Sequence, residues 1–427
     1  METVGAYLAR KHEELRLLNG CLGKPLSLAY PRSVADVIRH KFQLTAALKA
    51  EHAIHDWAAT ETAWADLAQR DSGPFKFRYD YQRADLDVKG PSFYEFSDDT
   101  TSETVYTASG MAAISALMLA SAQVIAEADI LILPSSYGET QELIKSHARH
   151  LRLVALKREP EEAQALKSST RVFLLDSSAP AVEFEAALRS MRSADLMIFD
   201  TTCFSGSSIR IRRVINLARA RALPVVLVRS HTKLDSLGAE YGRLGSVTFV
   251  DCEKNASWAR RSKLGDLPGH VRNAVRLLGG AALPAHFPPY IGLPTYRELS
   301  HRRLAAILRN SRRSSRYFRV ALPDLTEEIR FAHGLYLTLK ASTRLDEAAA
   351  RRAAAELSEN LGRAGFPIRH AGSFGFDFAA TEWFHNAATG QYSIRISVPD
   401  LPSGLWDDLT ASIARWWSTH QGECDTA

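Results

Sequence analysis

Between about residues 105 and 255, short apolar runs alternate with amphipathic stretches, and this alternation constrains the fold more than any other feature of the chain. The apolar runs are Ile130–Leu133, Leu151–Leu156, Val172–Leu175, Leu196–Phe199, Val225–Val228 and Val247–Val250. The helical stretches between them are Gly110–Glu127, Thr140–His150, Ala181–Met191 and Ile209–Ala220. Apolar strands that alternate with helices are typical of a mostly parallel sheet covered on both faces. The pattern predicts an α/β fold whose ligands bind beyond the carboxyl ends of the strands.

The regions on either side of this pattern have a different character. Residues 1 to about 70 have apolar residues at helical spacing, and residues 75 to 104 are polar and aromatic, which predicts an ordered loop. The last part is rich in Arg and Ala and predicts a smaller α+β domain, with strands at His333–Thr338 and Tyr392–Val398 and a final helix at Leu405–Trp417. We therefore predict a helical N-terminal segment at 1–74, a large domain at 75–295 and a small C-terminal domain at 296–427.

The composition of the 427 residues, 46% hydrophobic and 24% charged, is that of an ordinary globular enzyme. The longest apolar runs are strand-sized, and the N-terminus shows no secretion signal, so we expect a cytoplasmic protein that does not engage a membrane. The four cysteines have no metal-site spacing, so no metal is expected. A basic cluster contains Arg309, Arg312, Arg313, Arg316 and Arg319. No recognition motif accompanies it, which favours a solvated helix face or a subunit contact over nucleic acid.

The tetrapeptide Ser230-His231-Thr232-Lys233 follows the apolar run Pro224–Arg229, at the point where a buried strand should end. A lysine at that position can form a Schiff base. The hydroxyls of Ser230 and Thr232 could bind a phosphate. The alternative is a solvated lysine after a strand.

A second segment with phosphate-binding character begins the helix after residue 108. Ser109 can cap this helix, and Gly110 and Met111 place backbone N–H groups at its positive end, where an anion can bind. An ordinary capped core helix is the alternative.

Three further side chains have the chemistry of a cofactor or substrate site. Tyr137 follows a strand and could stack on a ring or move protons, or it is a surface loop residue. Asp200 ends a strand and could pair with a pyridinium nitrogen, or it caps a helix. The guanidinium of Arg395 could bind a carboxylate in a bidentate manner, or it forms a salt bridge on an edge strand.

The chain order of these segments resembles that of fold-type-I enzymes dependent on pyridoxal 5'-phosphate (PLP). The amino-acid sequences of the segments resemble the motifs of the cystathionine γ-synthase/γ-lyase (Cys/Met metabolism) family. The matching segments are Ser109–Ile114, Tyr137-Gly138, Asp200-Thr201-Thr202, Ser230–Lys233, Arg395–Val398 and, for a Tyr-x-Arg motif, Tyr81-Gln82-Arg83. The resemblance covers about residues 75 to 400 and implies the PLP-dependent transferase (aspartate aminotransferase-like) fold.

The resemblance implies a role for each matching residue. Lys233 would hold PLP as an aldimine and then act as the base, with Tyr137 assisting proton transfer. Asp200 would stabilise a quinonoid through the ring nitrogen, and Arg395 would bind the substrate carboxylate. The remaining cofactor-binding residues would be Ser109, Gly110, Met111, Thr202, Ser230 and Thr232. Tyr81 and Arg83 would be given to the phosphate by a neighbouring subunit, so a homodimer or homotetramer with shared active sites is expected.

The implied reaction is γ- or β-elimination or replacement on a small substituted amino acid, that is, a lyase or transferase activity. An aminotransferase or decarboxylase would use the same cofactor residues. A nicotinamide dehydrogenase is disfavoured because no G-x-G-x-x-G follows an early strand, and a non-enzymatic binding protein would require the whole set to be coincidental. The chain departs from the family near the substrate: Ala179 replaces an asparagine, and the segment after Lys233 is one residue longer.

Overall fold

The computed structural model describes residues 1–55, 70–79, 86–156, 170–190, 194–252, 258, 263–322, 334–340, 345–386 and 390–424. The contacts of the chain divide it into two compact units. The first unit contains Met1–Glu51, Ser236–Glu240 and Leu293–Ala427, and the second contains His52–Asp235 and Tyr241–Gly292. The first unit therefore includes five residues that begin directly after Asp235, close in sequence to Lys233.

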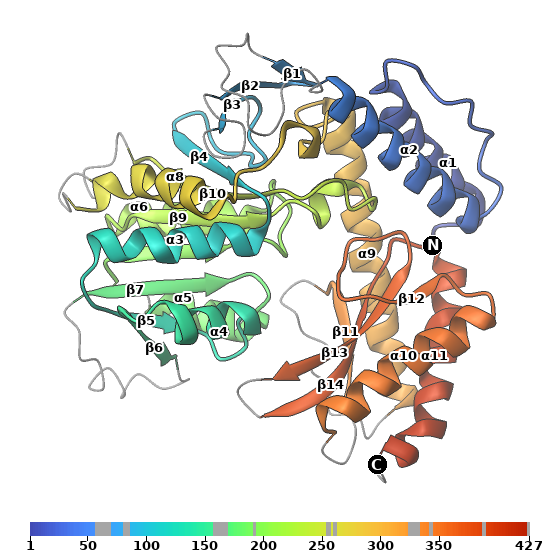
Figure 1. Cartoon of the computed structure of the whole chain (residues 1–427). Helices are drawn as coiled ribbons and strands as arrows, with labels where there is room; N and C mark the ends of the chain where they lie inside the picture. Colours follow the sequence, from blue (N-terminus) through green and yellow to red (C-terminus); the bar gives the residue numbers. More distant parts are fainter. Residues whose placement is uncertain are drawn as a thin grey trace. The chain divides into compact units, whose positions relative to one another are not determined.

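Within the described residues, a seven-stranded sheet in the order β4-β10-β9-β8-β7-β5-β6 forms the centre of the second unit (Figure 1). The strands are β4 (Ser102–Thr107), β5 (Ala128–Ile132), β6 (Leu151–Ala155), β7 (Arg171–Asp176), β8 (Leu196–Asp200), β9 (Val225–Ser230) and β10 (Gly245–Val250). Neighbours from β9 to β6 pair in parallel, whereas β10 is antiparallel to both β9 and β4. The predicted mostly parallel α/β sheet is confirmed.

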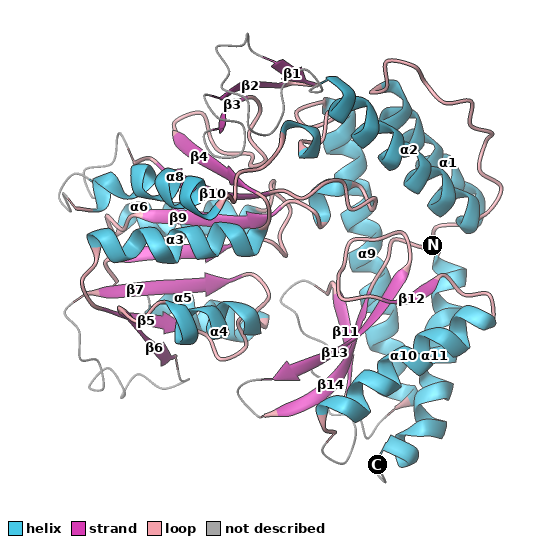
Figure 2. Ribbon diagram, in the orientation of Figure 1, coloured by secondary structure: helices cyan, strands magenta, loops and turns pink. Residues whose placement is uncertain are grey.

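Helices cover both faces of this sheet (Figure 2). One face packs against α3 (Gly110–Val124), α4 (Gly138–His147) and α8 (Leu267–Leu278), and the other against α5 (Ala181–Ser190) and α6 (Ile209–Ala220). Successive residues of a strand enter opposite cores: Ile130 and Ile198 belong to the first, Leu131 and Met197 to the second. Burial on both sides explains why these strands are apolar throughout.

The prediction of a loop over residues 75 to 104 is correct for residues 90–101 but wrong for the parts that form strands. This region contains β2 (Phe75–Tyr79) and β3 (Leu86–Lys89), which form an antiparallel sheet with β1 (Arg70–Ser72), and it also contains the start of β4. Strand β2 alternates buried Phe75 and Phe77 with exposed Lys76, the pattern of a sheet with one solvated face. Strand β4 lies at the edge of the large sheet and is mostly polar, so it lacks the apolar run that identified its neighbours.

The first unit contains the predicted N-terminal helices and the smaller α+β region, which confirms the predicted α+β character of the C-terminal part. Its helices are α1 (Val4–Gly20), α2 (Val34–His55), α9 (Pro294–Ala321), α10 (Glu347–Arg363) and α11 (Ser403–Cys424). Its sheet has the order β11-β14-β13-β12, formed by β11 (Tyr336–Leu339), β12 (Ile368–His370), β13 (Ala379–Asn386) and β14 (Gln391–Ser397). None of the described helices combines the length and the apolar character that crossing a membrane requires.

A buried charge cluster lies inside the first unit. Its members are Arg10, Lys11, Lys41 and Arg303 with the carboxylates of Glu14, Asp377 and Asp400, all at most 6% exposed. Lys41 Nζ also donates to the carbonyl oxygen of Leu237. Gly238 has φ +82°, and a Cβ there would lie 2.5 Å from Nη2 of Arg303. The cluster therefore holds the Ser236–Glu240 segment through its backbone, and only glycine suits position 238.

Candidate functional site

The sequence-predicted residues of the second unit lie along one edge of its sheet. Ser230 ends β9 and Asp200 ends β8, the neighbouring parallel strand. Gly245, the first residue of β10, pairs with both Ser230 and Thr107, the last residue of β4. Helix α3 begins three residues after Thr107. The carboxyl ends of β4, β8 and β9 thus meet where ligands of such sheets bind.

The start of α3 lies against Ser230. A Cβ built on Gly110 would be 2.9 Å from Cβ of Ser230 and 3.2 Å from its backbone nitrogen, so this close approach requires glycine. Oγ of Ser109 caps the helix by accepting from the amide of Ala112 at 3.0 Å. Oγ of Ser230 lies 3.1 Å from Oγ1 of Thr232. The first amides of a helix and two adjacent hydroxyls form a cradle suited to an anion.

Thr202 joins this cradle to Asp200. Its amide donates to Oδ1 of Asp200 at 2.9 Å, and its Oγ1 accepts from the amide of Ser230 at 3.0 Å. The hydroxyl of Thr202 is thus occupied by the backbone of β9. Met111 packs its side chain against the core of the sheet, so at this position only its backbone is suited to a ligand.

Two carboxylates lie side by side at the sheet edge, because Asp176 of β7 is the register partner of Asp200 of β8. Burial raises the pKa of Asp200, the negative charge of Asp176 raises it further, and the two effects bring it to about 7. Burial also raises the pKa of Asp176, against the hydrogen bonds that its carboxylate accepts from the amides of Tyr137 and Ser178. A positively charged group beside Asp200 would relieve this unfavourable arrangement.

Tyr137 precedes α4 and is fixed by Asp176. Its amide donates to Oδ2 of Asp176 at 2.7 Å, and its side chain is partly exposed. The carboxylate accordingly lies at the positive end of α4, where negative charge is favourable. Asp176 therefore positions the loop that holds Tyr137, a role that sequence reasoning missed.

Lys233 lies in a turn whose two ends are held by buried hydrogen bonds. Nδ1 of His231 lies 2.8 Å from Oδ2 of Asp235, and Asp235 also forms a two-pronged ion pair with Arg229, with both distances 2.7 Å. Burial would raise the pKa of Asp235, but the charge of Arg229 and the hydrogen bonds from Arg229 and His231 outweigh it and lower the pKa to about 2. The side chain of Lys233 is partly exposed.

Arg395 belongs to the first unit, where it forms an ion pair. Its Nε and Nη2 lie 2.7 and 2.6 Å from Oε1 of Glu382, its cross-strand partner. The guanidinium also lies over the rings of Tyr336 and Phe384, at 4.2 and 4.6 Å from their centroids. Arg395 thus forms the salt bridge of the alternative interpretation, but on an inner strand rather than an edge strand, because β14 pairs with both β11 and β13.

The structure brings together most of the predicted cofactor residues, namely Ser109, Gly110, Tyr137, Asp200, Thr202, Ser230, Thr232 and Lys233, at or beside one sheet edge. Tyr81 and Arg83 lie outside the described residues. Sequence reasoning missed Arg229 and Asp235, whose signal was an arginine at the end of an apolar run. Among the described residues, no group of His, Cys, Asp and Glu side chains is placed to hold a metal ion.

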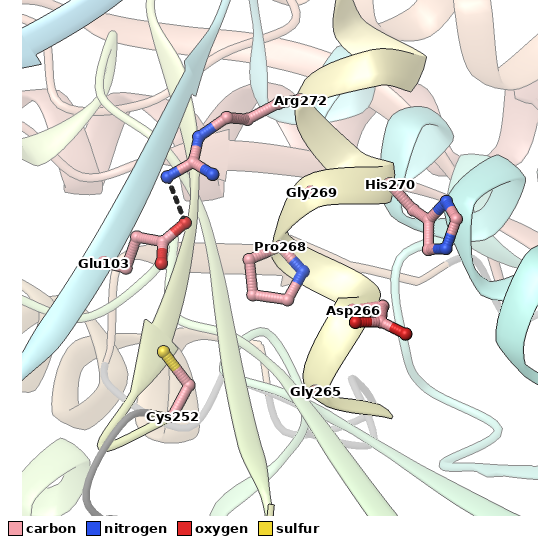
Figure 3. A pocket seen from close by; sticks show the side chains of 8 residues that line it. All are labelled: Glu103, Cys252, Gly265, Asp266, Pro268, Gly269, His270 and Arg272. Atoms are coloured by element: carbon pink, nitrogen blue, oxygen red, sulfur yellow. Dashed lines mark ion pairs between the residues drawn. The ribbon is translucent and has the colours of Figure 1, made fainter. Parts of the chain in front are cut away.

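A cavity of about 590 Å³ lies elsewhere in the second unit and contains none of the predicted residues (Figure 3). It is lined by Glu103, Cys252, Gly265, Asp266, Pro268, Gly269, His270 and Arg272. Glu103 lies at the start of β4 and Cys252 after the end of β10, opposite to the ends that meet Ser230. Figure 3 shows the ion pair between Glu103 and Arg272 across this cavity.

No protein-family model matches the sequence, and no curated protein matches it. Solved structures do match. A cystathionine γ-synthase from Xanthomonas oryzae pv. oryzae in complex with cystathionine is 18% identical, with 88% of this chain and 99% of that chain covered and a TM-score of 0.54. The metB protein from Corynebacterium glutamicum is 17% identical over 74% of this chain and 80% of that chain, with a TM-score of 0.52.

A third match is a cystathionine γ-lyase from Lactobacillus plantarum complexed with L-serine. It is 16% identical over 74% of this chain and 82% of that chain, with a TM-score of 0.51. The chain thus has the fold of cystathionine γ-synthase and γ-lyase structures, and the resemblance read from the sequence motifs is confirmed at the level of the fold.

Proposed function

We propose that the protein is a PLP-dependent lyase or synthase that catalyses γ- or β-elimination or replacement on a substituted amino acid. The observation that carries this proposal is the close approach of Gly110, at the start of α3, to Ser230, three residues before Lys233. This approach supports a phosphate site beside Lys233, because a phosphorylated aldehyde needs both an anion cradle and an amine.

The residues at the sheet edge fit pyridoxal phosphate. The amides at the start of α3 and the hydroxyls of Ser230 and Thr232 would hold its phosphate, and Lys233 would hold its aldehyde carbon. Asp200, whose pKa burial and Asp176 raise to about 7, would gain a counter-charge from the protonated ring nitrogen. When bound, the cofactor supplies an electron sink for negative charge at the substrate Cα.

The chain's own residues would orient the substrate and move its protons. Nζ of Lys233 would take the Cα proton, and the hydroxyl of Tyr137 would assist the transfer from the substrate amine. Arg395 would bind the carboxylate after exchange of Glu382. A second proton shift by Lys233, from Cβ, would allow departure at Cγ, whereas without it the leaving group departs from Cβ.

The names of the similar structures support an amino-acid substrate, because those proteins were solved with cystathionine and with L-serine. Assay of γ- and β-substituted amino acids for ammonia and keto acid, against formation of a new amino acid, separates elimination from replacement. Transfer of the amino group or release of carbon dioxide instead would indicate an aminotransferase or a decarboxylase.

Borohydride reduction tests the cofactor assignment directly. We expect the protein to bind PLP, and reduction to fix one cofactor to a peptide that contains Lys233. Lys233→Ala should abolish the adduct, while Lys145→Ala, which alters an exposed lysine of α4, should leave it intact. Absence of an adduct in the wild-type protein, or its persistence in Lys233→Ala, would overturn the proposal.

We also propose a homodimer or homotetramer whose partner subunit supplies Tyr81 and Arg83 to the phosphate. If so, mixing Lys233→Ala with Arg83→Ala subunits should restore part of the activity, because one kind of mixed site would carry neither substitution. Recovery is followed by activity after subunit exchange, with analytical ultracentrifugation to establish the assembly. Failure to recover activity in mixed oligomers would argue against sharing.

A further inference from the structure

The turn that contains Lys233 is flanked by a buried network outside the groups assigned to the cofactor. It consists of Arg229, His231, Asp235 and Ser246, and each of them is at most 4% exposed. We infer that Arg229 and Asp235 are positioning residues, which through His231 hold the Ser230–Lys233 turn in the geometry that binds the cofactor. This inference rests on the proposed function.

Arg229 connects the two loops that bear the candidate site. Its Nε and Nη2 bind the two oxygens of Asp235, two residues after Lys233, and its Nη1 donates to the carbonyls of Thr201 and Phe204 at 2.8 and 2.7 Å. Thr201 directly follows Asp200. One guanidinium therefore fixes the backbone beyond Asp200 and the backbone beyond Lys233 relative to each other.

Asp235 and His231 close the turn on itself. The carboxylate of Asp235 spans the four residues back to Nδ1 of His231, while Nε2 of His231 lies 2.8 Å from Oγ of Ser246 on β10. The amide of His231 donates to Leu244, and its ring lies 3.8 Å from the Phe93 ring, centroid to centroid. Both nitrogens and one face of the imidazole are thus engaged, so the ends of the turn are fixed around Thr232 and Lys233.

The chemistry of the network requires these particular side chains. Only arginine offers a planar fork that can bind a carboxylate in a bidentate manner and still donate to two carbonyls. Burial lowers the pKa of His231, against the neighbouring charge of Asp235, and the two ring nitrogens of His231 link that carboxylate to the hydroxyl of Ser246. An ion pair with a purely structural role would also stabilise the fold. The two roles are distinguished by comparing stability with PLP binding in variants of two different ion pairs.

A second ion pair in the same unit provides the matched control. Asp251 accepts from Nε of Arg219 at 2.7 Å and from the amide of Thr101 at 2.9 Å, at the opposite end of β10 from Ser246. Asp235→Asn and Asp251→Asn each remove the charge of one buried or partly buried carboxylate. Both variants should lower the unfolding midpoint, but only Asp235→Asn should act on the cofactor.

We expect Asp235→Asn to raise the dissociation constant for PLP at least about tenfold and to shift the pH dependence of the bound cofactor's absorbance. Asp251→Asn should leave both close to wild type. Arg229→Lys should weaken PLP binding as Asp235→Asn does, because a point charge cannot replace the fork. If Asp235→Asn lowers stability alone, or if Asp251→Asn changes PLP binding equally, the inference is wrong.

Hydrogen exchange of the cofactor-free protein separates this inference from the proposed function. Amides of residues 230–236 should exchange at least about tenfold faster in Asp235→Asn than in Asp251→Asn. If the wild-type protein forms no adduct with PLP, the proposed function is wrong. Equal exchange rates in the two variants would in that case also refute the inference that Asp235 holds the Ser230–Lys233 turn. An adduct with equal exchange and equal affinity would refute only the inference.

Discussion

Gly110 offers the sharpest test of the anion cradle, because its substitution by alanine acts on a measured contact. The added Cβ would lie 2.9, 3.2 and 3.3 Å from Cβ, N and Cα of Ser230, and two of these atoms are backbone. Strand β9 is paired on both sides, and the amide of Ser230 is bonded to Thr202, so Ser230 cannot move without disturbing its neighbours.

Overpacking of this kind costs about 1–3 kcal/mol, partly offset by the higher helix propensity of alanine, worth up to about 1 kcal/mol. We expect Gly110→Ala to lower the free energy of unfolding by about 1–2 kcal/mol. Gly269 provides the control, since it lies in the first turn of α8 with nothing within 4 Å of an added Cβ. Gly269→Ala should leave the free energy of unfolding unchanged or raise it by about 0.5–1 kcal/mol.

Thermal unfolding of the cofactor-free proteins measures the difference. About 2 kcal/mol between the two variants corresponds to roughly 2–4 °C in Tm for a chain of this length. Titration with PLP should show weaker binding for Gly110→Ala and unchanged binding for Gly269→Ala. Equal Tm values, or undiminished affinity in Gly110→Ala, would refute the reasoning that α3 and Ser230 form one cradle.

Three further substitutions test the electrostatics. The folded-state pKa of Asp200, about 7, lies above its unfolded value, so its contribution to stability is present at acid pH and lost as pH rises through 7. Asp200→Asn should therefore stabilise the cofactor-free protein at pH 8, by up to roughly 4 kcal/mol in urea unfolding, and have little effect at pH 4. If Arg395 binds the substrate carboxylate as proposed, Glu382→Gln should lower KM for an amino-acid substrate about tenfold with similar kcat in initial-rate assays, because a competing carboxylate is lost; a raised KM would show that Glu382 holds Arg395 in place. Lys41→Met should cost about 3–5 kcal/mol in urea unfolding, since it leaves buried carboxylates unpaired, whereas a neutral effect would mean that the remaining cations suffice.

The sequence predicted the central sheet well, because strands buried on both faces are apolar at nearly every position and stand out as continuous apolar runs. The run Val225–Val228 became β9, and Ile209–Ala220 became α6 with the same bounds. Strands β2 and β4 were not predicted, because only some residues of each are buried. A strand buried on one face alternates apolar and polar residues, which is a weaker signal than a continuous apolar run.

The candidate site was predictable where chemistry lies in local motifs and unpredictable where it depends on distant pairing. Ser230 and Lys233 are three residues apart, so they lie close together whatever the tertiary structure. The contact of Arg229 with the Thr201 carbonyl joins residues 28 positions apart, and Glu382 meets Arg395 only through the register of β13 and β14. Such partners are fixed by topology, which the local sequence does not specify.

The assignment of Ser236–Glu240 to the first unit has a thermodynamic consequence. The chain leaves the second unit three residues after Lys233 and returns at Tyr241, and in between Lys41 and the Leu237 carbonyl are bonded within the buried charge cluster. Opening that cluster would release the peptide beside the lysine, so a ligand that requires an ordered lysine turn also favours the closed cluster. If the proposed cofactor binds at Lys233, its binding should therefore increase the protection of the amides around Leu237 from hydrogen exchange.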